Sequence, residues 1–111
     1  MKKRILITGG AGFIGINTAN YLLTKKYKVI LFDNLSRKGS EENLKWLKKT
    51  WGKQFAFIQG DVVTDRTRLN RAVADVDAVI HLAAQVAVTT SVQDPHHDFL
   101  VNAQGTLHVL E

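Results

Sequence analysis

The sequence predicts an α/β fold: a parallel sheet of the Rossmann type in the strand order 3-2-1-4, with helices on both faces. Short apolar runs alternate with helical patterns in the order β-α-β-α-β-α-β-α, with short connections. A glycine cluster, Gly9–Gly15, directly follows the first apolar run, and Asp33 ends the second. With right-handed crossovers, these elements make the first half of a doubly wound fold, and residues 1–111 form one dinucleotide-binding domain.

Strands are expected where β-branched and apolar residues form short runs, and helices where apolar residues recur at helical spacing. The strands are expected at residues 4–8, 28–33, 55–59 and 77–83. The helices are expected at residues 13–25, from residue 40 onward, at 65–74 and from residue 94 onward. Ser40 is expected to cap the second helix, with Glu41 and Glu42 in its first turn.

The glycine cluster predicts a site for a pyrophosphate. Gly10, Gly12 and Gly15 give the spacing G-x-G-x-x-G, and Gly9, Gly12 and Gly15 give the wider spacing G-x-x-G-x-x-G. The first N–H groups of a helix lack partners within the helix, so a strand-to-glycine-to-helix switch presents donors to an anion. Gly9 or Gly10 permits the tight turn, Gly12 lets the backbone approach phosphates, and Gly15 lets the helix pack against the strand. The alternative is an ordinary glycine turn, but the strand–turn–helix context favours a dinucleotide.

Asp33 predicts which dinucleotide is bound. A carboxylate at the carboxyl end of the second strand can accept both hydroxyls of the adenosine ribose and repels a 2′-phosphate. Asp33 therefore favours NAD over NADP. Arg37, four residues further on, argues in the opposite direction, because arginine pairs well with a phosphate.

Three other patterns are interpreted as structural. Tyr21 and Lys25 match the spacing Tyr-x-x-x-Lys, but they lie toward the far end of the phosphate-binding helix, so we reject them as a catalytic pair. His81 lies within a buried strand and is interpreted as a packed, hydrogen-bonded histidine. His96 and His97 are adjacent and so do not share a helix face, which disfavours a metal site.

Composition limits the remaining classes of function. The net charge of +5 and the pI of 9.7 invite a nucleic-acid partner, but the positive residues are dispersed and acidic residues interrupt them, so no nucleic-acid footprint is expected. The chain contains no cysteine, which excludes disulfides and thiolate metal sites and fits a cytoplasmic protein. No apolar run is long enough to span a membrane.

Several segments together resemble the extended short-chain dehydrogenase/reductases that act on nucleotide sugars. The resemblance to this family is carried by Thr8–Gly15, Asp33–Leu35, His81–Ala84 and Asn102–Thr106. Three further segments are most similar to the CDP-tyvelose 2-epimerase (CDP-paratose 2-epimerase) group: Phe32–Gly39, Asn43–Leu47 and Gln85–Ser91. The resemblance implies an epimerase that uses tightly held NAD to take a hydride from a sugar carbon, C2 in this group, and return it to the opposite face.

The resemblance also implies roles for individual residues. Phe13 and Ile14 would contact the pyrophosphate through their N–H groups. The adenosine ribose and its surroundings would be held by Asp33, Asn34, Ser36 and Arg37. Asp61 and Val62 would contact the adenine. The wall along the dinucleotide would be formed by Leu82, Ala83, Ala84, Gln85 and Asn102. A homo-oligomer would form through the helix at residues 98–110, and the substrate would be a nucleotide sugar, with a CDP-sugar suspected.

The chain departs from the family pattern at its carboxyl end. The family's catalytic serine or threonine, its tyrosine–lysine pair and its substrate domain lie beyond Glu111, so no catalytic residue and no metal ligand is assigned here. We therefore expect the amino-terminal portion of an epimerase, inactive by itself. Two alternatives stay open: a dinucleotide-binding module without catalysis, and another nucleotide-sugar epimerase or dehydratase, such as the UDP-glucose 4-epimerase type.

Overall fold

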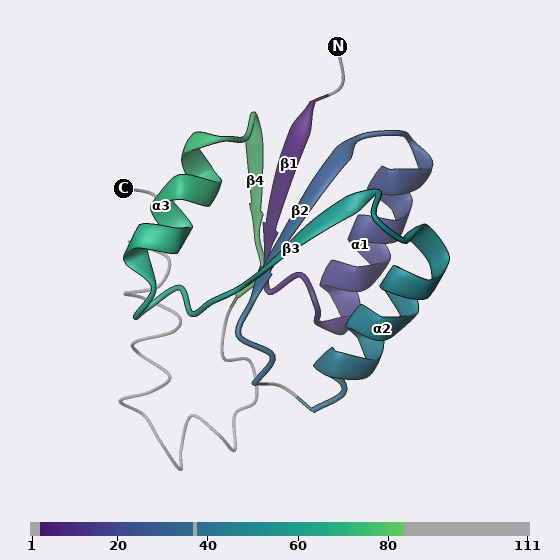
Figure 1. Cartoon of the computed structure of the whole chain (residues 1–111), viewed down its shortest axis with the longest axis horizontal. Helices are drawn as coiled ribbons and strands as arrows, with labels where there is room; N and C mark the ends of the chain where they lie inside the picture. The colour runs from purple at the N-terminus through teal and green to yellow at the C-terminus, as the bar shows by residue number, and fades with distance from the viewer. Residues whose placement is uncertain (1–2, 37, 84–111) are drawn as a thin grey trace.

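The computed structural model describes residues 3–36 and 38–83, which form a four-stranded parallel sheet with helices on both faces (Figure 1). The strands are β1 (Arg4–Thr8), β2 (Lys28–Asp33), β3 (Phe55–Gln59) and β4 (Ala78–His81). The helices are α1 (Phe13–Thr24), α2 (Ser40–Trp51) and α3 (Arg66–Ala74). The sheet order is β3-β2-β1-β4, so the predicted order 3-2-1-4 is confirmed. The helix expected from residue 94 onward lies outside the described residues.

The sheet separates two apolar clusters, because its central strands are buried on both faces. On one face, Ile5, Ile7 and Leu31 pack against α1 and α2. On the other face, Leu6 and Phe32 pack against α3. Figure 1 shows α1 and α2 on one side of the sheet and α3 on the other, as right-handed crossovers require when the chain returns from the β3 edge to β4.

Helix α2 begins differently from the prediction. Ser40 was expected as the N-cap, but it is the first residue of the helix and is buried. Gly39 is the N-cap instead, with φ +90°, a backbone conformation that glycine adopts more easily than other residues. The prediction of Ser40 as the cap was therefore wrong, whereas Glu41 and Glu42 do lie in the first turn.

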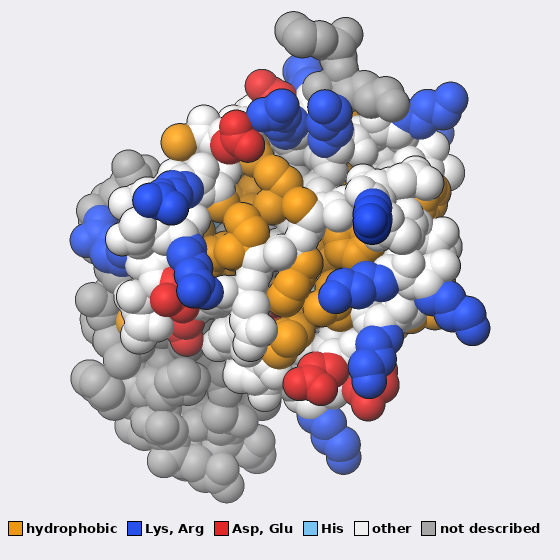
Figure 2. Space-filling view, in the orientation of Figure 1, with side chains coloured by type: hydrophobic (Ala, Val, Ile, Leu, Met, Phe, Trp, Pro, Cys, Tyr) orange, Lys and Arg blue, Asp and Glu red, His pale blue; other side chains and the backbone are white. Residues whose placement is uncertain are grey.

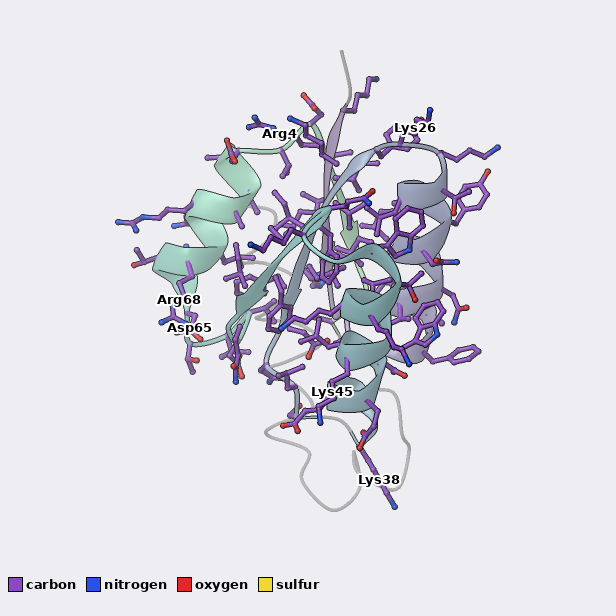
Figure 3. All side chains as sticks on the ribbon, turned by 45° about the vertical axis from the view of Figure 1, so that its right-hand side comes forward. Arg4, Lys26, Lys38, Lys45, Asp65 and Arg68 are labelled. Carbon is purple, nitrogen blue, oxygen red and sulfur yellow. The ribbon has the colours of Figure 1, made fainter. Side chains whose placement is uncertain are left out.

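Basic side chains are spread over the surface, as the composition suggested. Figure 2 shows Lys and Arg side chains scattered over one face and interspersed with Asp and Glu. Of the basic side chains labelled in Figure 3, Arg4 and Lys26 lie near the amino end of the sheet, Lys38 and Lys45 lie near the end where α2 begins, and Arg68 lies beside the start of α3. On these views, the described residues form no single basic face.

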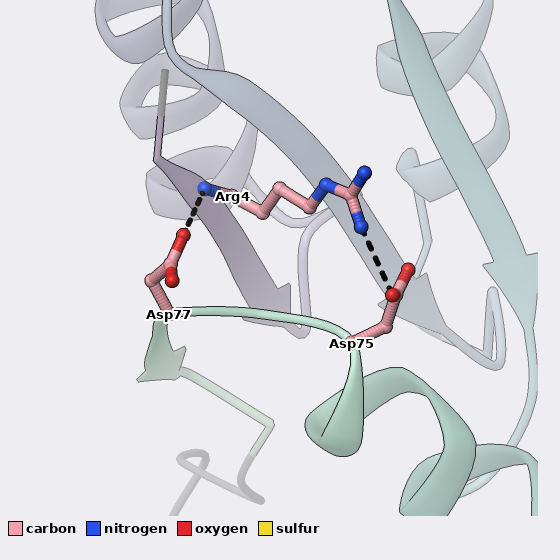
Figure 4. Close-up of polar contacts among 3 residues, drawn as sticks. All are labelled: Arg4, Asp75 and Asp77. Carbon is pink, nitrogen blue, oxygen red and sulfur yellow. Dashed lines mark hydrogen bonds and ion pairs between the residues drawn. The ribbon is translucent and has the colours of Figure 1, made fainter. Parts of the chain in front are cut away.

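Arg4 joins the start of β1 to the turn between α3 and β4 (Figure 4). Its main-chain N–H donates to Asp77 Oδ2 at 2.8 Å, and its Nη1 donates to Asp75 Oδ1 at 3.0 Å. The side chains of the ion pair are 46% and 64% exposed, so the pair contributes at most about 1 kcal/mol to stability. These contacts help to hold β4 beside β1 at the amino end of the sheet.

Candidate functional site: the glycine turn and the carboxyl edge of the sheet

The turn after β1 is anchored on both neighbouring strands. Gly9 N–H donates to Phe32 O at 2.8 Å, which ties the turn to β2. Gly9 has φ +66°, and a Cβ placed there would lie 2.8 Å from the main-chain nitrogen of Ala83, just beyond β4. The tight turn therefore requires glycine at position 9, because the backbone has a positive φ and because a side chain would meet the main chain just beyond β4.

Gly15 allows α1 to pack closely against the turn, whereas Gly12 leaves space beside the start of the helix. A Cβ on Gly15 would lie 2.5 Å from Gly9 O, so α1 can approach the turn only because residue 15 has no side chain. At Gly12 the nearest neighbour of such a Cβ is Gly9 O at 3.4 Å, an ordinary contact. Space is thus left beside the residue that directly precedes α1, where a phosphate could approach the backbone.

The start of α1 offers uncapped donors. Gly12 is the N-cap, and no side chain of the described residues makes a capping hydrogen bond to this helix. The first turn contains no acidic residue that would compete with an anion. Phe13 and Ile14 have side chains that are 79% and 65% exposed, so they are not buried against the sheet. The N–H groups of this turn and the positive end of the helix dipole suit a pyrophosphate.

The Asp33 carboxylate is held in place at the end of β2. Its Oδ2 accepts from Ala11 N–H at 3.0 Å, and its Oδ1 accepts from Leu35 N–H at 2.7 Å. Each carboxylate oxygen has two acceptor positions, so one on each oxygen remains for a ribose hydroxyl. The half-buried carboxylate thus lies beside the glycine turn.

The loops after β2 and β3 are joined by their polar side chains. Asn34 Nδ2 donates to Asp61 Oδ2 at 3.1 Å. Asp61 Oδ1 accepts from Val63 N–H at 2.7 Å, and Asp61 N–H donates to Asp65 Oδ2 at 2.7 Å. The structure thus brings together two of the residues that were predicted near the adenosine. The side chain of Val62, in contrast, is buried in the cluster under α3.

A hydroxyl that the sequence interpretation passed over joins β1 to the exit of β4. Thr8 Oγ1 accepts from Leu82 N–H at 3.1 Å and from Ala83 N–H at 3.3 Å. It also lies 2.6 Å from His81 Nδ1. The Thr8 hydroxyl thus joins the His81 side chain to the main chain just beyond β4. His81 is therefore hydrogen-bonded and partly buried, as interpreted from the sequence.

The remaining predicted residues are placed in part. Leu82 and Ala83 lie against the turn at Gly9, and Ser36 N–H donates to Asn34 Oδ1 at 3.0 Å. Tyr21 is exposed at the carboxyl half of α1, with Lys25 Nζ 5.7 Å from its ring centroid. Four predicted cofactor residues lie outside the described residues: Arg37, Ala84, Gln85 and Asn102.

The described residues contain neither a metal-binding cluster nor a membrane-spanning helix. Among residues 3–36 and 38–83, no cluster of three or more His, Cys, Asp or Glu side chains could hold a metal ion. Within those same ranges, no helix has the length and apolar character to cross a membrane.

Comparison with known proteins identifies the family to which this chain belongs. Residues 6–111 match the model of the family described as GDP-mannose 4,6 dehydratase. The chain belongs to this family. The expected membership in the extended short-chain dehydrogenase/reductases acting on nucleotide sugars is thereby confirmed.

Relatives in this family include epimerases of more than one kind. The chain is 46% identical over 110 residues to CDP-paratose 2-epimerase of Salmonella typhi, covering 97% of this chain and 32% of that protein. It is 38% identical over 109 residues to UDP-glucose 4-epimerase of Haemophilus influenzae, and the match covers 96% of this chain and 32% of that protein. The fold is similar to the solved structure of Thermus thermophilus UDP-glucose 4-epimerase in complex with NAD, with a TM-score of 0.81 and 38% sequence identity. This match covers 96% of this chain and 32% of that chain. The chain thus spans about a third of the length of the relatives it matches.

Alanine substitutions at Gly12 and Gly15 should distinguish the role of the turn in helix packing from its role in NAD binding. Gly15→Ala places a methyl group against main-chain atoms of the turn, so we expect it to lower the free energy of unfolding by about 1–3 kcal/mol. Gly12→Ala should cost less than about 1 kcal/mol, since its methyl group meets an ordinary contact, but it should weaken NAD binding. Urea unfolding and calorimetric titration of both variants measure the two effects. Equal loss of stability in the two variants would contradict the assignment.

His81 leads to a prediction about pH. Burial lowers the pKa of His81 from its ordinary value of 6.5, so the unfolded chain takes up a proton before the folded chain does as the pH falls. The free energy of unfolding should therefore decrease as the pH drops from about 6.5 toward the lowered pKa, and this contribution should be constant above about pH 7.5. In His81→Asn, whose amide does not titrate, that decrease should be absent. Urea unfolding between pH 5 and 8 compares the two proteins, and parallel pH curves would overturn the prediction.

Proposed function

We propose that this chain is the NAD-binding part of a nucleotide-sugar epimerase. The observation that carries the proposal is the placement of an uncapped helix start beside a carboxylate that retains free acceptor positions. The first would bind the pyrophosphate, and the second would bind the adenosine ribose. The complex of the Thermus thermophilus relative with NAD supports the choice of cofactor.

The residues present fit NAD in three respects. The space beside Gly12 admits a phosphate, the first turn of α1 supplies N–H donors, and Asp33 can accept ribose hydroxyls. Asn34 and Asp61 would lie along the adenosine, and Leu82 and Ala83 along the dinucleotide. When bound, NAD supplies the hydride chemistry of epimerisation. The residues of this chain bind and orient it, and none of them is assigned as the proton acceptor.

For the substrate, we propose a CDP-sugar of the paratose and tyvelose type, epimerised at C2. The 46% identity to the Salmonella typhi CDP-paratose 2-epimerase supports this choice. The identity of 38% to a UDP-glucose 4-epimerase favours that activity as the second candidate. We also propose a cytoplasmic protein that forms a homo-oligomer through residues 98–110, and no turnover by this chain alone.

The substrate proposal is tested by incubating the protein with NAD and either CDP-paratose or UDP-glucose, and by separating the sugar products. A longer protein that carries this sequence should convert CDP-paratose, whereas the 111-residue chain should convert neither. Conversion of UDP-glucose alone would replace the first candidate by the second. Turnover by the 111-residue chain would contradict the placement of the catalytic residues beyond it. NAD binding without turnover by any form of the protein would favour the alternative of a binding module.

Asp33 gives the prediction that tests the cofactor choice. Asp33→Ala should weaken NAD binding on the order of tenfold or more, because it removes charged acceptors for the ribose hydroxyls. NADP binding should weaken less, since the variant also loses the charge that repels a 2′-phosphate. Calorimetric titration of both cofactors against the wild type and the variant measures this difference. An equal loss for the two cofactors would remove Asp33 from its assigned role.

A further inference from the structure

We propose that Asn43 is a positioning residue that sets the cofactor selectivity of this site by holding the glycine turn against Asp33. Asn43 lies in the first turn of α2 and was not among the residues predicted to form the site. Its Nδ2 donates to Ala11 O at 2.9 Å, across 32 positions of sequence. The inference rests on the proposed function, that NAD binds at the glycine turn.

Ala11 is held from both of its peptide groups. Its N–H donates to Asp33 Oδ2, and its carbonyl accepts from Asn43 Nδ2. The residue itself is fully buried. Because these two bonds fix successive peptide planes, they define the backbone conformation of Ala11. A buried carbonyl left without its donor would carry a desolvation cost, so the turn would rearrange when the Asn43 amide is removed.

The position of Asn43 is itself fixed by the start of α2. Asn43 N–H donates to Gly39 O at 3.0 Å, and Gly39 is the N-cap in the left-handed region. The side chain is half-buried between the helix and the turn. Since a carbonyl can only accept a hydrogen bond, an amide suits this position and a carboxylate does not.

Loss of the Asn43 amide would affect the bound cofactor through the orientation of the Asp33 carboxylate. The carboxylate is oriented by two main-chain donors, one of which is Ala11 N–H. When the turn at Ala11 is no longer held by Asn43, that donor moves, and the free acceptor positions of Asp33 lose their fixed direction. Those positions distinguish a ribose hydroxyl from a 2′-phosphate. Loss of Asn43 therefore weakens NAD binding more than NADP binding.

The test is a calorimetric titration of NAD and NADP against the wild type, Asn43→Ala and Asn43→Asp. Asn17→Ala is the matched control, because Asn17 Nδ2 also donates to a main-chain carbonyl, that of Phe13 in its own helix, at 2.8 Å. We expect Asn43→Ala to raise the Kd for NAD on the order of tenfold and to lower the preference for NAD over NADP severalfold. Asn43→Asp should raise the Kd for NAD at least as much, since it places a carboxylate oxygen, an acceptor, against the Ala11 carbonyl, which is also an acceptor. Asn17→Ala should change both Kd values by less than about twofold.

The outcomes separate this inference from the function on which it rests. A wild-type protein that binds neither cofactor contradicts the proposed function. Wild-type NAD binding with an unchanged preference in Asn43→Ala overturns the inference alone. An equal loss for both cofactors also overturns it, because that result describes general support of the fold. Circular dichroism checks folding, and the isosteric Asn43→Asp carries the comparison if the alanine variant unfolds. Unfolding of both variants would assign Asn43 to the fold and refute its role in selectivity.

Discussion

The structure depends on the close approach of the α1 backbone to the turn after β1. At Gly15 the two backbones leave no room for a Cβ, and at Gly9 the turn lies against the exit of β4. This contact fixes where α1 begins and therefore where its free N–H groups lie. A side chain at Gly15 would push α1 away from the turn, and one at Gly9 would push the turn away from the main chain after β4.

Around that contact, polar groups join the ends of the strands to one another. Thr8 links β1 to β4 through main-chain N–H groups, Asp33 links β2 to the turn, and Asn34 with Asp61 links the loops after β2 and β3. The carboxyl edge of the sheet is thus connected by hydrogen bonds among its own residues. A site arranged in this way spends little free energy on ordering its own groups when a cofactor binds.

The fold and the position of Asp33 beside the glycine turn could be predicted because they depend on local pattern, whereas the binding roles of these residues stay predictions. Apolar periodicity gave the strands and helices, right-handed crossovers gave a parallel sheet with helices on both faces, and the doubly wound fold gave the strand order. The contacts of Thr8 with His81 and of Asn43 with Ala11 could not be predicted, because they join residues 73 and 32 positions apart and a single sequence does not indicate which polar groups meet. The start of α2 was misassigned because serine is a common N-cap, whereas the left-handed Gly39 takes that position here.

Binding of NAD at the start of α1 can be tested by titrating the ¹⁵N-labelled protein with NAD and following its amide resonances in two-dimensional NMR spectra. We expect the largest changes at Gly12, Phe13 and Ile14, where the pyrophosphate would meet the start of α1. The amides near Arg4 and Asp77, at the opposite end of the sheet, should stay unchanged. A site at the glycine turn would be refuted if saturating NAD left the α1 amides unaffected or moved resonances only at the amino end of the sheet.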